Sequence, residues 1–220
     1  GIVEFTAFDR AENNNKKVDN TVIIVDNINP VAQITYNEPV QQANGISYYA
    51  GNIDAKIVIQ EANFYAEDVI VTITKDGLSY ASNVTWVDNS VDIHTGTFTL
   101  TEDGDYIVTV KYIDRSTNEM ETYVSNRLTL DTKQPTINVS NIVMNSANKD
   151  ERYPFTITAD DINIDSSSFM PVLTATVRNE DGDYETKKIS LGSLKTVQSG
   201  KTYAYSVDNL TEDAVYSLVC

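Results

Sequence analysis

The stretch Asp103-Gly104-Asp105-Tyr106-Ile107-Val108-Thr109-Val110 decides the expected fold of this chain. Its Asp-Gly pair is a strong turn signal, and the residues that follow are rich in β-branched side chains that alternate with polar ones. Alternation with a period of two is typical of a β-strand that turns one face toward a core. The stretch therefore predicts a tight turn that leads into a half-buried strand.

Segments of the same kind recur along all 220 residues. The clearest are Ile57-Val58-Ile59, Val69-Ile70-Val71-Thr72-Ile73, Phe98-Thr99-Leu100 and Arg127-Leu128-Thr129-Leu130. Turn signals separate them, such as Asn44-Gly45, Asp76-Gly77 and Asp181-Gly182. No convincing long run has its apolar residues at helical spacing. Many short strands with regular turns predict a β-sandwich or a barrel.

The chain also resembles itself. Shifted by 105 residues, Ile2-Val3, Asp9-Arg10, Asp26 and Pro30 fall without a gap on Ile107-Val108, Asp114-Arg115, Asp131 and Pro135. A shift of 110 places Leu100–Tyr106 on Leu210–Tyr216, and a looser one of 100 places Ile57, Glu61 and Asn63 on Ile157, Asp161 and Asn163. We predict three copies of one unit. Residues 1–29 are the C-terminal hairpin of a preceding repeat, 30–134 a complete domain, and 135–220 a domain that lacks its last strand.

Two tyrosines indicate which sandwich this unit is. In immunoglobulin-type sandwiches a tyrosine near the start of a strand bonds back to the backbone a few residues upstream, which is called the tyrosine corner. Tyr106 and Tyr216 both occupy such a position, and Trp86 offers a bulky core residue for the middle domain. Because Cys220 is the only cysteine, no disulfide joins the sheets. The expected fold is all-β, with tandem immunoglobulin-like β-sandwiches.

Several motifs resemble a known family. The segment Phe5-Thr6-Ala7-Phe8-Asp9-Arg10-Ala11-Glu12-Asn13 resembles the T-A-x-D-x-A-G-N hairpin of bacterial immunoglobulin-like repeats, and residues 26–30 and 131–135 resemble the V-D-x-x-x-P joints between such repeats. Residues 59–64, with Trp86, are similar to tandem cell-surface proteins of Gram-positive gut bacteria. The chain departs from the pattern at Glu12 and Thr117, where the family usually has glycine. The resemblance implies an extracellular stalk or adhesin segment without catalytic residues.

Charge and composition narrow the functional classes. With 16 basic and 32 acidic residues the net charge is −16, which disfavours nucleic acid as a partner. Apolar runs such as Val22–Val25 are too short to span a membrane. With one histidine and one cysteine, the chain offers few of the side chains that commonly serve as catalytic bases or nucleophiles, so we expect no enzyme. We predict a rigid structural spacer of a secreted or surface-attached bacterial protein. The alternative is an adhesin module that binds a host glycan or protein.

Candidate site residues are few, and we expect no catalytic, cofactor or metal site. His94, which has no second histidine as partner, is expected in a loop or on a sheet face, and Cys220 is expected at a core position. Asp26, Asn27 and Asn29 form an acidic joint, where solvated turns are the favoured interpretation and a bound calcium ion the alternative.

Three other features leave alternatives open. Tyr36, Tyr48, Tyr49, Tyr184, Tyr203 and Tyr205 are candidate ligand contacts, although tyrosine is common in strands for its propensity alone. Lys56, Glu61 and Asn126 offer the residue types of an autocatalytic Lys–Asn cross-link, but no spacing selects them. The hairpin of residues 1–29 either packs on the middle domain or completes the third unit of another molecule, which predicts head-to-tail association.

Overall fold

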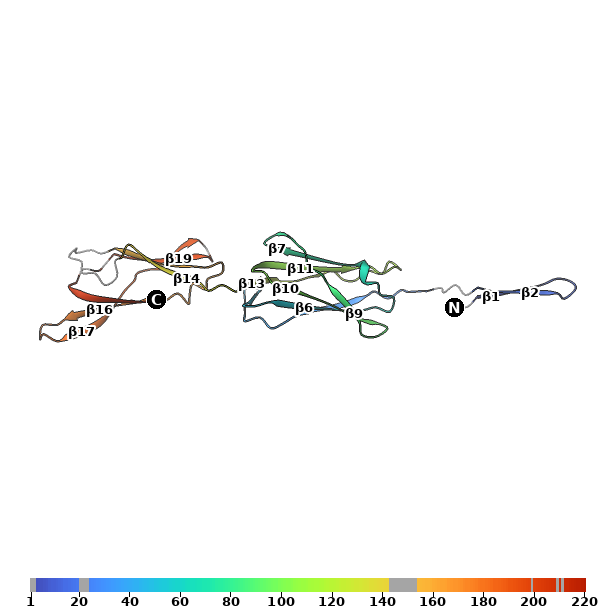
Figure 1. Ribbon diagram of the computed structural model, residues 1–220, viewed down its shortest axis with the longest axis horizontal. Coiled ribbons are helices and arrows are strands. Elements are labelled where there is room, and N and C mark those ends of the chain that lie inside the picture. The colour runs from blue at the N-terminus through green and yellow to red at the C-terminus, as the bar shows by residue number, and fades with distance from the viewer. Residues whose placement is uncertain (1–2, 20–23, 143–153, 199, 209, 211) are drawn as a thin grey trace. The chain divides into compact units, whose positions relative to one another are not determined.

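The computed structural model describes residues 3–19, 24–142, 154–198, 200–208, 210 and 212–220. It is almost entirely β, and η1 (Ala66–Asp68) is the only helical segment of this part. The chain divides into two compact units, Gly1–Thr132 and Lys133–Cys220 (Figure 1). Each contains two sheets packed on one another, and the first also contains an N-terminal hairpin. The predicted all-β sandwich fold is therefore confirmed.

The first unit packs a four-stranded sheet on a seven-stranded one. The order in the first sheet is β3 (Val31–Tyr36), β6 (Ile53–Gln60), β10 (Ile93–Leu100) and β9 (Thr85–Asp88). The second sheet has the order β4 (Gln41–Ala43), β5 (Ile46–Tyr49), β13 (Arg127–Leu130), β11 (Gly104–Tyr112), β7 (Val69–Lys75) and β8 (Leu78–Tyr80), with β12 (Tyr123–Val124) also on β11. All neighbours are antiparallel except β13 and β5, which are parallel.

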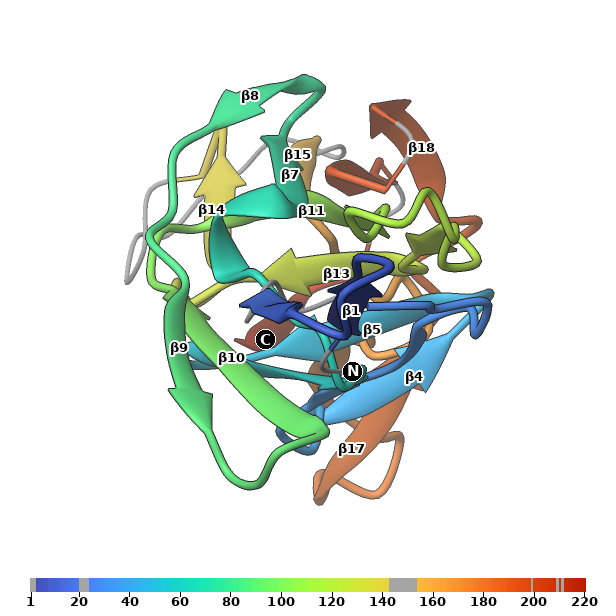
Figure 2. The same cartoon turned by 90° about the vertical axis from the view of Figure 1, so that its right-hand side faces the viewer.

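The core of this unit follows from the period-two pattern of its strands. On β6 every second side chain is buried, including Ile53 and Ile57, and on β11 the same holds for Tyr106 and Val108. The two sets come from different sheets and belong to one core, whose layers can be followed in Figures 1 and 2. Full burial of such side chains stabilises the fold by roughly 1.5–3 kcal/mol each.

Trp86 packs against this core, as the sequence suggests, and it does so over a glycine. Trp86 lies opposite Gly96 on the neighbouring strand β10. A Cβ atom built on Gly96 would approach the Trp86 ring to 2.9 Å. Gly96 is therefore required for the close approach of the indole.

Both tyrosine corners form. The hydroxyl of Tyr106 donates a 2.6 Å hydrogen bond to the Glu102 carbonyl oxygen. The hydroxyl of Tyr216 donates to the Glu212 carbonyl oxygen, four residues upstream in the same way, at 3.2 Å. The two tyrosines thus make equivalent local contacts in the two units.

The second unit packs a four-stranded sheet on a three-stranded one. The order in the first sheet is β14 (Thr136–Ser140), β15 (Phe155–Asp160), β19 (Thr202–Val207) and β18 (Lys195–Gln198). In the second it is β17 (Tyr184–Ile189), β16 (Val172–Arg178) and β20 (Ala214–Val219). Phe155, Ile157 and Leu173 are the centre of the core. Cys220 follows β20 and is exposed, so its expected core position is wrong, because the strand ends one residue before it.

The N-terminal segment is a hairpin of β1 (Val3–Phe8) and β2 (Asn14–Asp19). At its turn, Asp9 Oδ1 accepts hydrogen bonds from the backbone N–H groups of Ala11 and Asn13. Asp114 Oδ1 accepts from Ser116 and Asn118 in the same pattern, after β11. The two turns that the 105-residue shift aligns therefore have the same hydrogen bonds.

Candidate functional site

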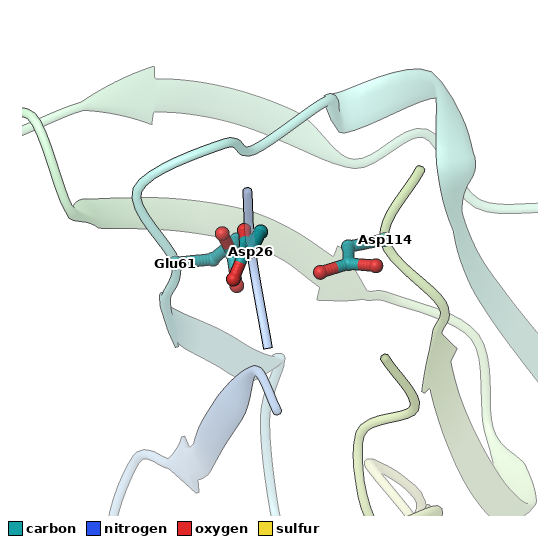
Figure 3. Close-up of side chains that lie close together, drawn as sticks. All are labelled: Asp26, Glu61 and Asp114. Carbon is teal, nitrogen blue, oxygen red and sulfur yellow. The ribbon is translucent and has the colours of Figure 1, made fainter. Parts of the chain in front are cut away.

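Three carboxylates come together near the start of the first sandwich. One oxygen from each of Asp26, Glu61 and Asp114 lies within 4.8 Å of the others, and these residues are called the carboxylate cluster below. Glu61 and Asp114 are only 5% and 4% exposed, whereas Asp26 is half-buried. Figure 3 shows that the three side chains come from separate segments of the chain.

The ends of two core strands position two of these groups. Glu61 directly follows β6, and its backbone N–H donates to the Asp92 carbonyl oxygen at 2.9 Å. Asp114 follows β11 by two residues and lies at the first position of the Asp-x-x-x-Asn turn. Asp26 belongs to the segment that leads into β3, and its own carboxylate accepts from the Ile28 N–H at 3.1 Å.

Two asparagines tie the segments together. The side-chain amide of Asn63 donates to Asp26 Oδ2 at 2.7 Å, while its backbone N–H donates to Glu61 Oε1 at 2.7 Å. The side-chain amide of Asn118 donates to Asp114 Oδ2 at 2.7 Å and to the Asp26 carbonyl oxygen at 3.3 Å. The position of Asp26 is therefore fixed by side chains from two loops of the sandwich.

The carboxylate cluster concentrates negative charge, which affects the pKa values of its members. Burial raises the pKa of Glu61, and the neighbouring charges of Asp26 and Asp114 raise it further. The hydrogen bond from the Asn63 side chain lowers the pKa of Asp26. None of the ion pairs found between described residues includes any of the three carboxylates. The site thus gathers negative charge without a basic side chain paired to it in the described structure.

This donor set favours a hard cation. Calcium binds six to eight oxygen atoms from carboxylates, carbonyls, amides and water, whereas zinc and copper prefer nitrogen or sulfur ligands. The three clustered residues offer only carboxylate oxygens. The arrangement is therefore suited to calcium, with Asp26, Glu61 and Asp114 as the carboxylate ligands.

His94 lies beside the cluster but takes a structural position. It is 6% exposed, on β10, and its ring stacks on Phe64 with centroids 4.2 Å apart. Nε2 lies 2.8 Å from the Glu61 carbonyl oxygen and Nδ1 lies 2.7 Å from Asp88 Oδ1. Both ring nitrogens are thus engaged, and the side chain supports the backbone at Glu61. The sequence predicted a loop or sheet-face histidine, and the structure places it on a strand, facing inward.

The sequence identified one member of the cluster and missed two. Asp26 was recognised as part of an acidic joint, but its neighbours Asn27 and Asn29 are exposed and do not belong to the cluster. Glu61 and Asp114 lie 35 and 88 residues further on, a separation that local motif reading does not bridge. A signal existed, because the internal overlays pair these acids with Asp161 and Asp9.

The cross-link residues are not assembled. Lys56 and Asn126 are exposed, whereas Glu61 is buried. Lys56 points outward because it alternates with Ala55 and Ile57, whose side chains enter the core. The three residues therefore do not share a buried site, and that alternative is wrong.

Most of the candidate aromatic contacts serve the cores. Tyr36 packs on the first core, Tyr203 and Tyr205 pack on the second, and Tyr49 is 5% exposed. Tyr48 is half-buried. Only Tyr184 is largely exposed among the six. The adhesin alternative therefore stays a prediction, and these six tyrosines do not form an exposed aromatic surface that would support it.

Comparisons with known proteins assign no family. No family model matches the chain, and no curated protein is significantly similar to it. In the described part of the chain, no helix has the length and apolar character needed to cross a bilayer.

Proposed function

We propose that the chain is a spacer segment, built from immunoglobulin-like sandwiches in series, of a secreted or surface-attached bacterial protein. The observation that carries the proposal is the recurrence of the same local geometry at positions that the sequence overlays pair. The turns at Asp9 and Asp114 and the corners at Tyr106 and Tyr216 are two such pairs. Repeated modules joined by short linkers are typical of extended structural proteins.

The strand order adds support. The sheet β3-β6-β10-β9 corresponds to the A-B-E-D order of immunoglobulin domains, and β13-β11-β7 corresponds to G-F-C. In the second unit, β14-β15-β19-β18 has the same order as the first of these sheets.

Small-angle X-ray scattering of the dilute full chain tests the spacer. A compact 220-residue globule has a radius of gyration of about 17 Å. The proposal predicts a value clearly larger, with a distance distribution that has a long tail. A radius near that of the globule would contradict it.

We further propose that the carboxylate cluster binds calcium and stiffens the segment that leads into β3. The observation that favours this second function is the placement of three carboxylates, two of them buried, within 4.8 Å. A divalent cation would offset their mutual repulsion, and it would bind Asp26 of the leading segment to Glu61 and Asp114 of the sandwich. Calcium sites of extracellular modules have dissociation constants on the order of 10⁻⁴–10⁻³ M.

Thermal unfolding with calcium or with a chelator tests this function. At about 10 mM calcium, binding of that strength stabilises the folded state by about 1.4–2.7 kcal/mol. We expect a rise in melting temperature of several degrees, followed by Trp86 fluorescence, and a smaller rise with magnesium. The variants Asp26→Asn, Glu61→Gln and Asp114→Asn should lose the calcium response.

Asp161→Asn is the matched control. Asp161 accepts a hydrogen bond from the Asn163 N–H at 3.3 Å, as Glu61 does from Asn63, but it lies in the second unit. This variant should keep the full calcium response of the first unit. With chelator present, Glu61→Gln should be at least as stable as the wild type, because it removes a buried charge beside two others. No shift of the wild type at 10 mM calcium would overturn the calcium site.

A further inference from the structure

A groove in the first sandwich lies between the start of β3 and the segment of residues 119–124, which contains β12. Its volume is about 570 Å³, within the range of about 300–1,000 Å³ that is usual for binding sites. Both walls supply apolar lining: Pro30, Val31, Ala32, Met120, Tyr123 and Val124. Val31 and Val124 are 63% and 59% exposed, so each wall presents apolar surface to a ligand.

The β3 wall has a free strand edge. Among the described strands β3 pairs only with β6, and β12 pairs only with β11. The other strand near this side of the sandwich, β13, is engaged with β11 and β5. One side of the β3 backbone therefore has no partner strand, although the strands of both sheets are in place. An uncovered edge of this kind is a template for an added strand.

Side-chain contacts join the two walls. The Tyr123 hydroxyl donates to the hydroxyl oxygen of Tyr36, at the end of β3, at 3.5 Å. Asn118, directly before the second wall, donates its side-chain amide to the carbonyl oxygen of Asp26 at 3.3 Å. The walls are therefore held together before a ligand arrives, which reduces the cost of ordering on binding.

The charge of the groove selects the kind of ligand. Glu119 and Glu121 lie on it and are exposed, and none of the described residues that line it is basic. None of the ion pairs between described residues includes either glutamate. Complementary charge favours a basic ligand and disfavours a second copy of this chain, whose net charge is −16. Sugars stack on exposed rings, whereas Tyr123, the one aromatic residue of the lining, is half-buried.

We propose that this groove binds an extended segment of a partner protein, with basic and apolar residues at alternate positions, as an added strand beside β3. Successive side chains of a strand point to opposite sides. One set packs on the apolar walls, and the other carries the basic groups that pair with Glu119 and Glu121. Backbone hydrogen bonds to β3 contribute affinity, and the charges select the partner. This binding site goes beyond the spacer and the calcium site and depends on neither.

A peptide of alternating valine and lysine, with blocked ends and the length of β3, is the probe. Fluorescence anisotropy of the labelled peptide with the full chain, at about 0.15 M salt, should show saturable binding. The same peptide with glutamate in place of lysine should bind at least tenfold more weakly. No saturable binding at concentrations up to about 1 mM, or equal binding of the two peptides, would overturn the proposal.

Methylation of the peptide backbone tests the added strand. A strand presents the N–H groups of alternate residues to one neighbour. Methylating one alternate set of amide nitrogens should abolish binding, whereas methylating the other set should leave it nearly unchanged. Equal effects of the two sets would contradict strand addition beside β3.

Charge reversal on the chain tests the location. The double variant Glu119→Lys and Glu121→Lys should bind the lysine peptide at least tenfold more weakly, with thermal unfolding, followed by Trp86 fluorescence, close to the wild type because both side chains are exposed. Glu180→Lys with Glu185→Lys is the matched control, since it changes the net charge equally at two exposed positions of the second unit. It should bind like the wild type. Equal losses in the two double variants would show that net charge alone attracts the peptide and would overturn the proposal.

Discussion

Tyr106 and Tyr216 make the same hydrogen bond in different surroundings. Tyr106 is fully buried, and burial raises the pKa of its hydroxyl, whereas the Tyr216 bond lies in an exposed setting. The Tyr106 hydrogen bond is part-buried, and losing a hydrogen bond that water reaches poorly costs more than losing an exposed one. The contribution of each corner is therefore set by the side chains around it.

Replacing each tyrosine by phenylalanine should show how much each hydroxyl contributes to the free energy of unfolding. We expect Tyr106→Phe to reduce the free energy of unfolding by about 1–2 kcal/mol, since the Glu102 carbonyl oxygen loses its partner. Tyr216→Phe should cost about 0.5 kcal/mol or less. Urea unfolding followed by Trp86 fluorescence measures the first change, and far-UV circular dichroism measures the second. Equal losses would show that burial does not set the difference.

The buried tyrosines also predict a sensitivity to alkali. Burial raises the pKa values of Tyr49, Tyr106 and Tyr112 above the ordinary value of 10.0. The folded state therefore holds these protons when the unfolded chain has lost them. Their stabilisation is complete below pH 10 and is lost as the pH rises above it, by at most about 1.4 kcal/mol per pH unit for each tyrosine.

Urea unfolding between pH 8 and 11 measures this loss. The free energy of unfolding of the first unit should fall with pH above about 10, and Tyr106→Phe should reduce the slope. A stability that is flat or rising through this range would contradict the burial of these hydroxyls.

At the scale of elements, the turn that closes the Asp114 loop contains a strained residue. Thr117 has φ = 72°, and Glu12 has φ = 63° in the aligned turn at Asp9. Left-handed backbone is unfavourable for a β-branched residue such as threonine and is readily adopted by glycine. These are the two positions where the resemblance drawn from the sequence predicts glycine.

Thr117→Gly should therefore stabilise the first unit, by about 0.5–1 kcal/mol, through relief of this strain. The neighbouring change Ser116→Gly is the control, because Ser116 has no left-handed backbone to relieve, and it should destabilise by roughly 0.5 kcal/mol. Urea unfolding followed by Trp86 fluorescence measures both. Destabilisation by Thr117→Gly would show that the threonine side chain contributes more than its backbone costs.

The β-strands could be predicted from the sequence more completely than the carboxylate cluster. The period-two runs at 57–59, 69–73 and 98–100 lie in β6, β7 and β10, because burial of one sheet face leaves its pattern directly in the sequence. The carboxylate cluster forms only because loops that are distant in the sequence lie side by side. The strand topology determines which loops do so, and local sequence patterns do not reveal it. The inward orientation of His94 was not predicted either, because its hydrogen bonds to Asp88 and Glu61 are tertiary contacts.

At the scale of the whole molecule, the spacer depends on the joint at residues 131–135. Its first residues are fixed on the first unit: the Asp131 N–H donates to the Tyr49 carbonyl oxygen at 2.9 Å, and the Thr132 N–H donates to Asp103 Oδ1 at 3.0 Å. Pro135, directly before β14, restricts its own φ and biases Gln134 toward extended backbone. The spacer proposal therefore predicts limited bending at this joint.

The distance distribution between spin labels on the two units tests this most directly. Labels at cysteines replacing the exposed Val87 and Tyr184, with Cys220 changed to serine, can be measured by double electron–electron resonance. If the chain is a spacer of serial sandwiches, the distance distribution in dilute frozen solution should show one narrow peak. A broad distribution, spread over the full range that a flexible linker permits, would contradict the account.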